Sequence, residues 1–245
     1  MASSQTERQF LKNYNIHDYD IPLVSVDIAI FSVIDDKLNI LTVKRAQHPR
    51  KGKWALPGGF IDLDTDKTIE DAAYRKLAEK TGVTKAHLEQ VISVGNNTRD
   101  PRGWSVTIAY MALVSVDAVD LRKDGSSEEV AWAPVEQLKK NNDLAFDHNE
   151  ILEICHQRLK DKVRYTSLPV NLLPPEFTLT ELQRIFEVIL AGPVEKKSFR
   201  RRILDAQILE EIGKFREGST RPAKLYRVAD KNTNYFFTRN IEGPR

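Results

Sequence analysis

Cysteine is almost absent from this sequence of 245 residues, because Cys155 is the only one. A single thiol excludes a disulfide framework and a metal site built from several cysteines. Long hydrophobic runs are missing as well, since no apolar stretch approaches the roughly 18–20 residues that span a bilayer. The first residues, MASSQTERQF, also lack the basic start and apolar centre of a secretory signal. We therefore expect a cytoplasmic protein with no membrane segment.

The charge is nearly balanced over the whole chain but unevenly distributed along it. The net charge of +2 combines 37 Lys and Arg with 35 Asp and Glu. Residues 1–162 hold 22 basic and 25 acidic residues, a net of −3, whereas residues 163–245 hold 15 and 10, a net of +5. A basic C-terminal third on a mildly acidic body favours a polyanionic partner for that third.

The first part of the chain has the pattern of a mixed α/β (α+β) domain. Residues 24–34 (VSVDIAIFSVI) are rich in β-branched residues, and after the turn DDK the segment 38–46 (LNILTVKRA) returns as a hairpin strand. A helix is expected between Thr68, which begins a capping box with Asp71, and Gly82. Strands and helices continue to interleave, so we assign residues 1–160 to one domain.

The C-terminal part has a different organisation. Three prolines in residues 165–177 (YTSLPVNLLPPEF) break any continuing helix, and we place a linker at residues 161–175. Residues 176–245 begin with a capping-box helix (TLTELQRIFEVIL), followed by a turn, a basic helix (SFRRRILDAQIL) and a tail that alternates like two strands. Helix, turn, basic helix and β-ribbon is the order of a winged helix-turn-helix domain.

The helix segment RKLAEKTG (residues 75–82) has an unusual charge pattern. Lys76, Glu79 and Lys80 are spaced i, i+3, i+4 and therefore share one helical face. Three carboxylates at this spacing would form a strong site for divalent metal, because such ions prefer hard oxygen ligands. An ammonium group a few ångströms from the ion instead repels it by roughly 1–4 kcal/mol per pair of unit charges. The face is therefore predicted to bind no metal.

Residues 58–83 resemble the Nudix box, the strand-loop-helix-loop signature of Nudix hydrolases. The second half of that signature reads Arg-Glu-apolar-x-Glu-Glu-x-Gly-apolar, and this chain matches it at Arg75, Leu77, Glu79, Gly82 and Val83. It departs from the signature at Lys76 and Lys80, where the family has glutamates that hold the catalytic metal ions. Lys67 also replaces the upstream glutamate. The resemblance therefore implies a retained fold without hydrolase activity.

A more specific resemblance covers most of residues 20–230. LPGGF, GNNTRDPRGWSVTIAYMAL, LAFDH, FTLTELQRIFEVILAG, SFRRRILD and RPAKLYR together look like the bacterial Nudix-related transcriptional regulator family. This resemblance implies a Nudix-like mixed-sheet sandwich with helices, plus a C-terminal winged helix-turn-helix domain. It also implies a repressor of NAD metabolism genes with ADP-ribose or a related nucleotide as effector, no cofactor and no metal.

Candidate ligand residues lie in three segments. A diphosphate favours arginines and backbone amides, and an adenine favours an aromatic face. RDPRGW supplies Arg99, Arg102 and Trp104, the end of the second strand and its loop supply Arg45, Lys53 and Trp54, and LPGGF supplies Gly58 and Gly59. The bland alternative places the tryptophans in the core and the arginines on the surface. His148 is expected to be structural and to cap the helix that follows it.

Candidate DNA-binding residues surround the basic helix and the tip of the ribbon. The start of a recognition helix normally enters the major groove, and an arginine at the ribbon tip suits an adjacent minor groove. The residues concerned are Lys196, Lys197, Ser198, Arg200, Arg201, Arg221, Pro222 and Lys224. The alternative is a solvated charge run on a protein-interaction domain.

These features predict a homodimeric repressor that binds double-stranded DNA at a palindromic operator. Winged helices usually read paired half-sites, which motivates the dimer. Two alternatives stay open at this point. One is an active Nudix hydrolase of ADP-ribose with shifted metal ligands, drawn from Asp62, Asp64, Asp66, Glu70 and Asp71, and a basic targeting domain. The other is an RNA-binding adaptor that uses the same basic helix.

Overall fold

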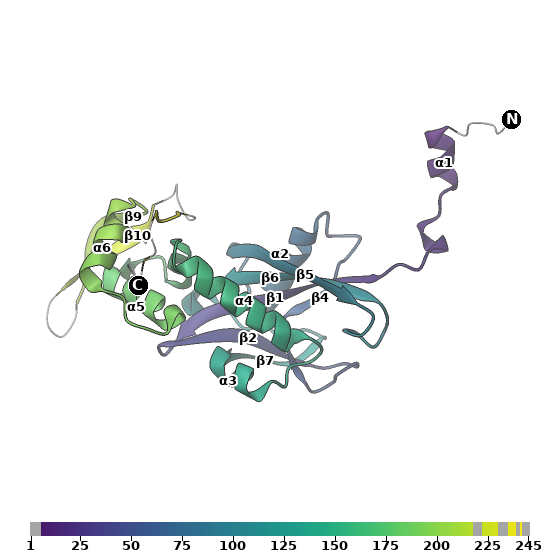
Figure 1. Cartoon of the computed structure of the whole chain (residues 1–245), viewed down its shortest axis with the longest axis horizontal. Coiled ribbons are helices and arrows are strands. Elements are labelled where there is room, and N and C mark those ends of the chain that lie inside the picture. Colours follow the sequence, from purple (N-terminus) through teal and green to yellow (C-terminus); the bar gives the residue numbers. More distant parts are fainter. Residues whose placement is uncertain (1–5, 218–221, 230–234, 239–240, 242–245) are drawn as a thin grey trace.

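The computed structural model describes residues 6–217, 222–229, 235–238 and 241 (Figure 1). Within them, the larger part of the chain is built on one sheet with helices on its faces, which we call the sheet region (residues 23–163). Its strands are β1 (Leu23–Ile34), β2 (Lys37–Arg45), β3 (Trp54–Ala55), β4 (Gly58–Phe60), β5 (His87–Asn96), β6 (Ser105–Leu113) and β7 (Ser127–Pro134). Its helices are α2 (Ile69–Thr81), α3 (Val135–Asn141) and α4 (His148–Val163), with a short 3-10 turn η2 (Val116–Ala118).

The sheet is mixed, as predicted. Its main path is β3-β2-β1-β6-β5, with β4 added to β1 and β7 to β2. Strand β1 runs parallel to β6, from Leu23 opposite Ser105 to Phe31 opposite Leu113, and the remaining pairs are antiparallel. Because β1 is central, it is buried on both sides over residues 26–32.

The two sides of β1 face different helices, because successive side chains of a strand point to opposite faces. Ile28 and Ile30 pack in one apolar cluster with Ala72, Ala73 and Leu77 of α2. Ala29 and Phe31 belong to a second cluster with residues of α4, which crosses the other side of the sheet (Figure 1). The sheet region is thus a helix-sheet-helix sandwich.

Helix α2 begins and ends as the sequence predicts. Thr68 accepts a hydrogen bond from the Asp71 amide at 3.1 Å, and the Asp71 carboxylate accepts one from the Thr68 amide at 2.9 Å. At the other end Gly82 adopts the left-handed conformation with φ of 70°, which glycine tolerates without a Cβ clash. Both helix ends are therefore fixed by local chemistry.

The C-terminal part is a winged helix, as predicted. Its elements are β8 (Phe177–Thr178), α5 (Leu179–Leu190), α6 (Lys196–Asp205), β9 (Leu209–Arg216) and β10 (Ala223–Val228), and its strands form the order β8-β10-β9. A capping box between Thr178 and Glu181 starts α5. Phe199 and Ile203 of α6 are fully buried against α5, where the Phe186 and Phe199 rings meet edge to face at 5.2 Å.

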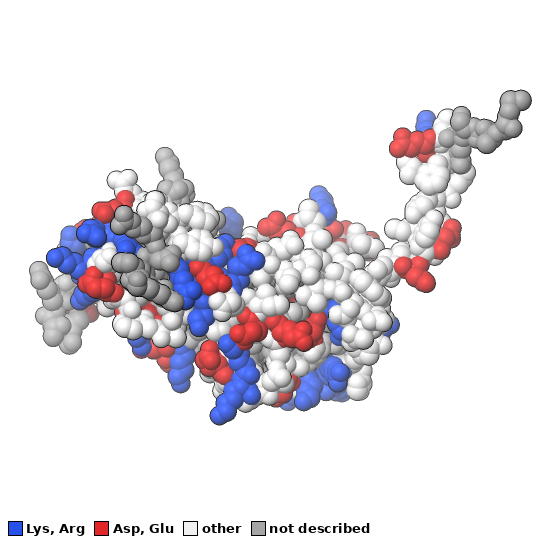
Figure 2. Space-filling view, in the orientation of Figure 1, with Lys and Arg blue, Asp and Glu red and all other residues white. Residues whose placement is uncertain are grey.

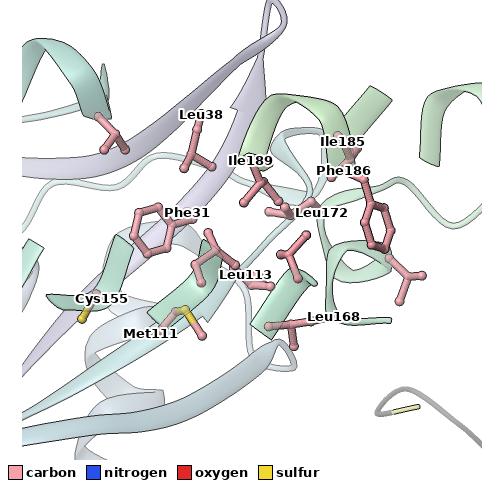
Figure 3. Close-up of a cluster of buried hydrophobic side chains, with 14 of the residues drawn as sticks. Phe31, Leu38, Met111, Leu113, Cys155, Leu168, Leu172, Ile185, Phe186 and Ile189 are labelled. Carbon is pink, nitrogen blue, oxygen red and sulfur yellow. The ribbon is translucent and has the colours of Figure 1, made fainter. Parts of the chain in front are cut away.

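The predicted linker at residues 161–175 is not an exposed spacer. Helix α4 continues to Val163, and the 3-10 helix η3 (Leu168–Leu172) buries Leu168, Val170 and Leu172. One apolar cluster runs from Phe31 and Met111 of the sheet through η3 to Ile185, Phe186 and Ile189 of α5 (Figure 3). The division into residues 1–160, 161–175 and 176–245 stays a proposal, since packing is continuous across it.

Residues 6–22 form an extension that we call the N-terminal arm. It contains the helix α1 (Glu7–Asn13) and the 3-10 turn η1 (Ile16–Asp18), and each of its residues is exposed. The arm projects from the end of the sheet region that lies farthest from the winged helix (Figure 1). In the described part of the chain no helix is long and apolar enough to cross a membrane.

Candidate functional site

A polar cleft opens where the ends of β1, β2 and β4 meet the loop between β5 and β6. Its volume is about 210 Å³. The lining side chains include Asp27, Arg45, Lys80, Arg99, Arg102 and His148, together with Gly58, Gly59, Phe60 and Phe146. The structure therefore brings together five of the predicted ligand residues, which are Arg45, Gly58, Gly59, Arg99 and Arg102.

The floor of the cleft is a rigid charged network around Asp27. Arg99 donates two hydrogen bonds to Asp147, at 2.9 and 3.0 Å, and a third to Asp27 at 3.4 Å. The Arg99 side chain is only 5% exposed, so its guanidinium is held by the protein before any ligand arrives. Gly58 is required beside this network, because a Cβ there would lie 2.3 Å from an Asp27 carboxylate oxygen.

His148 completes the floor, and its role differs from the predicted helix cap. The Leu56 amide donates a hydrogen bond to Nδ1 of His148 at 2.9 Å. The ring proton of the neutral imidazole therefore sits on Nε2, which lies 3.6 Å from Asp27. Burial lowers the pKa of His148, so the neutral form is favoured. The His148 side chain thus holds the backbone at Leu56, directly after β3, and does not cap the start of α4.

Arg102 and Arg45 form the cationic wall of the cleft. Arg102 pairs with both oxygens of Asp100, at 3.0 and 2.7 Å, and lies over the Phe60 ring at 4.8 Å from its centroid. Arg45 donates to the Pro49 carbonyl at 2.8 Å and lies 4.8 Å from the centroid of Phe146. Burial, followed by the nearby charge of Arg102, lowers the pKa of Arg45.

Arg45 is the cation with unused binding capacity. Among the residues that the structure describes, no carboxylate lies within ion-pair distance of its guanidinium. An anion in the cleft would relieve the repulsion between Arg45 and Arg102. It would also accept hydrogen bonds from guanidinium N–H groups, whose planar geometry suits phosphate oxygens. The cleft therefore favours an anionic ligand.

Three predicted ligand residues do not line the cleft. Trp54 lies on β3 and packs against the larger apolar cluster, as the bland alternative expected. Lys53 is exposed just before β3, and Trp104 is 51% exposed at the start of β6. Ligand contact by these three side chains remains an untested prediction.

On the face of α2 that carries Lys76, Glu79 and Lys80, the only carboxylate, Glu79, is already bound by cations of the same helix. Glu79 accepts from Arg75 at 3.0 Å and from Lys76 at 2.8 Å, so both carboxylate oxygens are engaged. Arg75 also binds Asp66 through two nitrogens, at 2.8 and 2.5 Å. In the described residues no group of three His, Cys, Asp or Glu side chains is arranged to hold a metal ion.

Lys80 has a structural role that sequence reasoning missed. Its side chain is 2% exposed, and its ammonium pairs with Asp124 and donates to the Ser127 hydroxyl at 2.9 Å and the Ser126 hydroxyl at 3.4 Å. These bonds tie α2 to the loop before β7, which forms one wall of the cleft. Burial raises the pKa of Asp124, but the bonds from Lys80 and Ser126 outweigh it and hold this pKa well below its ordinary value.

Four of the predicted DNA-binding residues, Lys196, Arg200, Pro222 and Lys224, line one groove of the winged helix. We call this groove and the adjacent start of α6 the basic face. Lys196, Lys197 and Arg201 are exposed at the start of α6, and the Ser198 amide is bonded to the N-cap residue Glu195 at 2.6 Å. Lys and Arg side chains are dense over this end of the molecule (Figure 2). The start of α6 thus presents cations to solvent.

A groove of about 740 Å³ runs beside α6 on the basic face. Arg200 lines it and donates to the Thr180 hydroxyl at 3.3 Å, while its buried Nε has no partner in the described residues. Lys196, Pro222 and Lys224 line the groove as well, and Lys224 pairs with Glu211 at 2.9 Å. Arg221 lies outside the described residues. The exposed ring of Phe215, which sequence reasoning missed, forms another wall.

A Nudix-like sheet with an anion-favouring cleft, packed against a winged helix with a basic face, defines a ligand-responsive DNA-binding regulator. Two family models support this class. The NUDIX domain matches residues 24–154, and the NrtR DNA-binding winged helix domain matches residues 169–228.

Comparison with known proteins gives the family. The chain is 48% identical over 240 residues, covering 98% of its own length and 95% of the relative's, to the ADPR responsive transcriptional repressor NtrR of Acinetobacter baylyi. It matches the crystal structure of Shewanella oneidensis NrtR complexed with a 27mer DNA with a TM-score of 0.83 and 43% identity, over 89% of this chain and 99% of that one. The NUDIX domain of the same protein, complexed with ADP ribose, matches with a TM-score of 0.59 and 42% identity over 63% and 99%. The chain therefore belongs to the NrtR family of Nudix-related transcriptional regulators.

The ion pair between Lys80 and Asp124 should make the free energy of unfolding depend on pH. The pKa of Asp124 is depressed in the folded state from its ordinary 3.8, so the carboxylate stabilises the fold above about pH 4 and this contribution is lost as the pH falls through the lower folded pKa. Asp124→Asn should lower the free energy of unfolding at pH 7 by about 1.5–3 kcal/mol, because it leaves the Lys80 ammonium buried without its counter-charge.

Urea unfolding between pH 7 and pH 2 measures this effect. The difference between wild type and Asp124→Asn should shrink as the pH falls below 4. Asp120→Asn serves as the matched control, because Asp120 pairs with Arg122 on the surface and is 75% exposed. Equal stabilities of the Asp124 and Asp120 variants at pH 7 would contradict the structural role of the buried pair.

Proposed function

We propose that this chain is a DNA-binding transcriptional repressor whose Nudix-like region binds ADP-ribose and thereby modulates operator binding. The observation that carries the proposal is the combination, in one chain, of the cationic cleft with the basic winged helix. The relative from Acinetobacter baylyi is named as an ADPR responsive repressor, and Shewanella oneidensis NrtR has been solved with DNA and, as its NUDIX domain, with ADP ribose. We place the protein with its DNA in the cytoplasm and its target genes in NAD metabolism.

The cleft suits the diphosphate of ADP-ribose. Arg45 has no counter-carboxylate among the described residues, and Arg102 is 42% exposed, so both guanidinium groups can turn donors towards phosphate oxygens. A volume of about 210 Å³ is below the 300–1,000 Å³ typical of pockets that enclose a drug-sized ligand. The diphosphate therefore occupies the cleft while the rest of the nucleotide extends across its rim.

Binding of ADP-ribose should depend on the two arginines of the cationic wall, Arg45 and Arg102. Arg45→Ala and Arg102→Ala should each raise the dissociation constant of ADP-ribose by about tenfold to a hundredfold, which corresponds to one lost charge-assisted bond of roughly 1.5–3 kcal/mol. Isothermal titration calorimetry on the folded variants measures this dissociation constant. Arg122→Ala, which removes an exposed arginine outside the cleft, is the control and should leave the constant unchanged. Unchanged affinity in both cleft variants would place the nucleotide elsewhere.

The Nudix-like region is proposed to sense its ligand without hydrolysing it. Lys76 and Lys80 stand where the family signature has metal-binding glutamates, and Glu79 is engaged by Arg75 and Lys76. Lys80 is held in a buried ion pair with Asp124, so a cation occupies part of the face where metal ions would bind. The competing function is an active hydrolase that draws shifted ligands from the acidic residues 62–71.

Turnover measurements separate the sensor from the hydrolase. Wild type incubated with ADP-ribose and either magnesium or manganese should release no AMP above the enzyme-free rate. Lys76→Glu combined with Lys80→Glu should restore an acidic face on α2 but remove the Lys80–Asp124 pair, so without metal the variant should melt below wild type. Added manganese should then raise the melting temperature of the variant and not that of wild type, because metal binding stabilises the folded state. Metal-dependent AMP release by wild type would establish the hydrolase instead.

The basic face is proposed to place the start of α6 in the major groove of an operator. Lys196, Lys197 and Arg201 would contact phosphates and base edges, and the described end of the ribbon at Pro222 and Lys224 would face the flanking groove. We propose a homodimer that reads a palindromic operator, because each winged helix contacts one half-site. The 27mer bound to Shewanella oneidensis NrtR is long enough for two half-sites one or two helical turns apart.

Specific DNA binding should weaken when an arginine of α6 is removed. Arg200→Ala or Arg201→Ala should weaken operator binding by about 1–3 kcal/mol, the value of one bidentate base contact, and leave ADP-ribose affinity unchanged. The matched control is Arg184→Ala on α5, whose guanidinium pairs with Asp36 of the sheet region at 2.7 Å.

Fluorescence anisotropy with a labelled operator measures this loss, and competition by structured RNA tests the adaptor alternative. Wild-type operator affinity in both α6 variants would remove this helix from the interface. Tighter binding to structured RNA than to duplex operator would favour the RNA-binding adaptor.

A further inference from the structure

The N-terminal arm exposes an unusual amount of apolar surface. Its large hydrophobic side chains are between 46% and 61% exposed, and they are Phe10, Leu11, Tyr14, Ile16, Tyr19 and Ile21. In the space-filling view, residues other than Lys, Arg, Asp and Glu form much of the described part of the arm (Figure 2). Exposed apolar surface gathered in one place marks an interaction site, whereas scattered single residues need no explanation.

The arm nevertheless has a defined local structure. Thr6 and Gln9 form a capping box at the start of α1, and the Asn15 side chain accepts from the His17 amide at 3.2 Å at the start of η1. The Tyr14 ring lies 5.5 Å from Phe10 and 5.8 Å from Tyr19. A helix as short as α1 is marginal in water by itself, so its stability must come from packing against another surface.

A second group of exposed hydrophobic side chains begins at the root of the arm and continues along the loop that leads to α2. These residues form what we call the apolar patch: Phe60, Leu63, Ile69 and Trp104, with Leu63 92% exposed. Phe60 pairs with Ser25 of β1, and the Trp104 carbonyl accepts from the Leu23 amide at 3.0 Å, so these two residues lie where the arm joins β1. Leu63 and Ile69 follow Phe60 along the chain, between β4 and the start of α2. Arm and patch together hold ten of the sixteen large exposed hydrophobic residues in the described chain.

The exit of the arm directs it away from its own patch. Pro22 fixes its own φ and favours an extended conformation at Ile21, so the chain leaves β1 along the strand direction. The arm accordingly projects beyond the sheet region (Figure 1). Since the patch begins at the root, the arm could cover it only by reversing direction at this stiff exit.

We propose that two copies of this chain exchange their N-terminal arms, each arm packing its apolar side chains on the apolar patch of the other copy. A two-fold arrangement makes this contact twice with the same pair of surfaces, because arm meets patch and patch meets arm. The inference rests on the proposed dimeric repressor and adds the location of its interface. The exchange also leaves the basic faces, at the opposite end of each molecule, free for DNA.

Cross-linking between differently tagged copies tests the exchange directly. One copy carries Tyr14→Cys on the arm and the other carries Leu63→Cys on the patch, and the two are co-expressed and treated with a short bismaleimide. Native Cys155 does not interfere, because it is fully buried and burial raises its pKa to about 12. The expected product is a two-chain species that contains both tags.

The matched control replaces Leu63→Cys by Leu121→Cys, a leucine 41% exposed outside the patch, and should give no such species. A chain that carries both Tyr14→Cys and Leu63→Cys should likewise cross-link between copies. Internal cross-linking within single chains, or equal two-chain products with Leu121→Cys, would overturn the proposal.

Sedimentation equilibrium gives an independent measurement. Leu11→Ser combined with Ile16→Ser should raise the dimer dissociation constant at least tenfold, whereas Leu121→Ser combined with Ile154→Ser should not change it. An unchanged dimer in the arm variant would overturn arm exchange, even if the protein binds its operator. Failure of the wild type to bind any operator would instead contradict the proposed function, because cross-linking reports the exchange without DNA.

Discussion

The apolar core that passes from the sheet into the winged helix is the constraint on which the rest of the structure depends. Phe31 and Met111 of the sheet, Leu172 of η3 and Phe186 of α5 belong to one buried cluster (Figure 3). Helix α4 connects this cluster to the cleft, because His148 at its start lines the cleft while Val163 at its end is buried in the cluster, and α4 also contacts α5. Close-packed interiors deform in discrete steps, so a shift of α4 on ligand binding would be transmitted to α5.

The charges around the cleft are arranged so that most cations are already neutralised. Arg99 is fixed by Asp147 and Asp27, Lys80 by Asp124, and Arg102 by Asp100. Arg45 stands apart, since within the described residues it has only a carbonyl and an aromatic ring as partners. One of these ion pairs also positions the cleft wall, because Lys80 of α2 binds Asp124 and Ser127 at the start of β7.

Local signals in the sequence predicted much of the fold. The capping boxes at Thr68 and Thr178, the apolar stripe of α5 and the alternation in β9 and β10 act over a few residues, and the structure confirms each of them. The cleft was only partly predictable, because its members come from distant segments. Nothing near Lys80 in the sequence indicates Asp124, and neither the packing of the half-buried Trp54 on the apolar cluster nor the hydrogen bond from Leu56 to His148 follows from local pattern. Such contacts depend on strand register, which periodicity alone does not specify.

The central claim is that the cleft and the basic face are coupled through this shared core, and linkage measures it directly. The affinity for ADP-ribose is determined by calorimetry with free protein and with protein saturated with operator, and operator affinity is determined with and without saturating ADP-ribose. Thermodynamic reciprocity requires the two affinities to change by the same factor, and coupling of ordinary strength gives about 5- to 150-fold. We predict equal factors within this range. Affinity for ADP-ribose that is identical with and without operator would contradict the account.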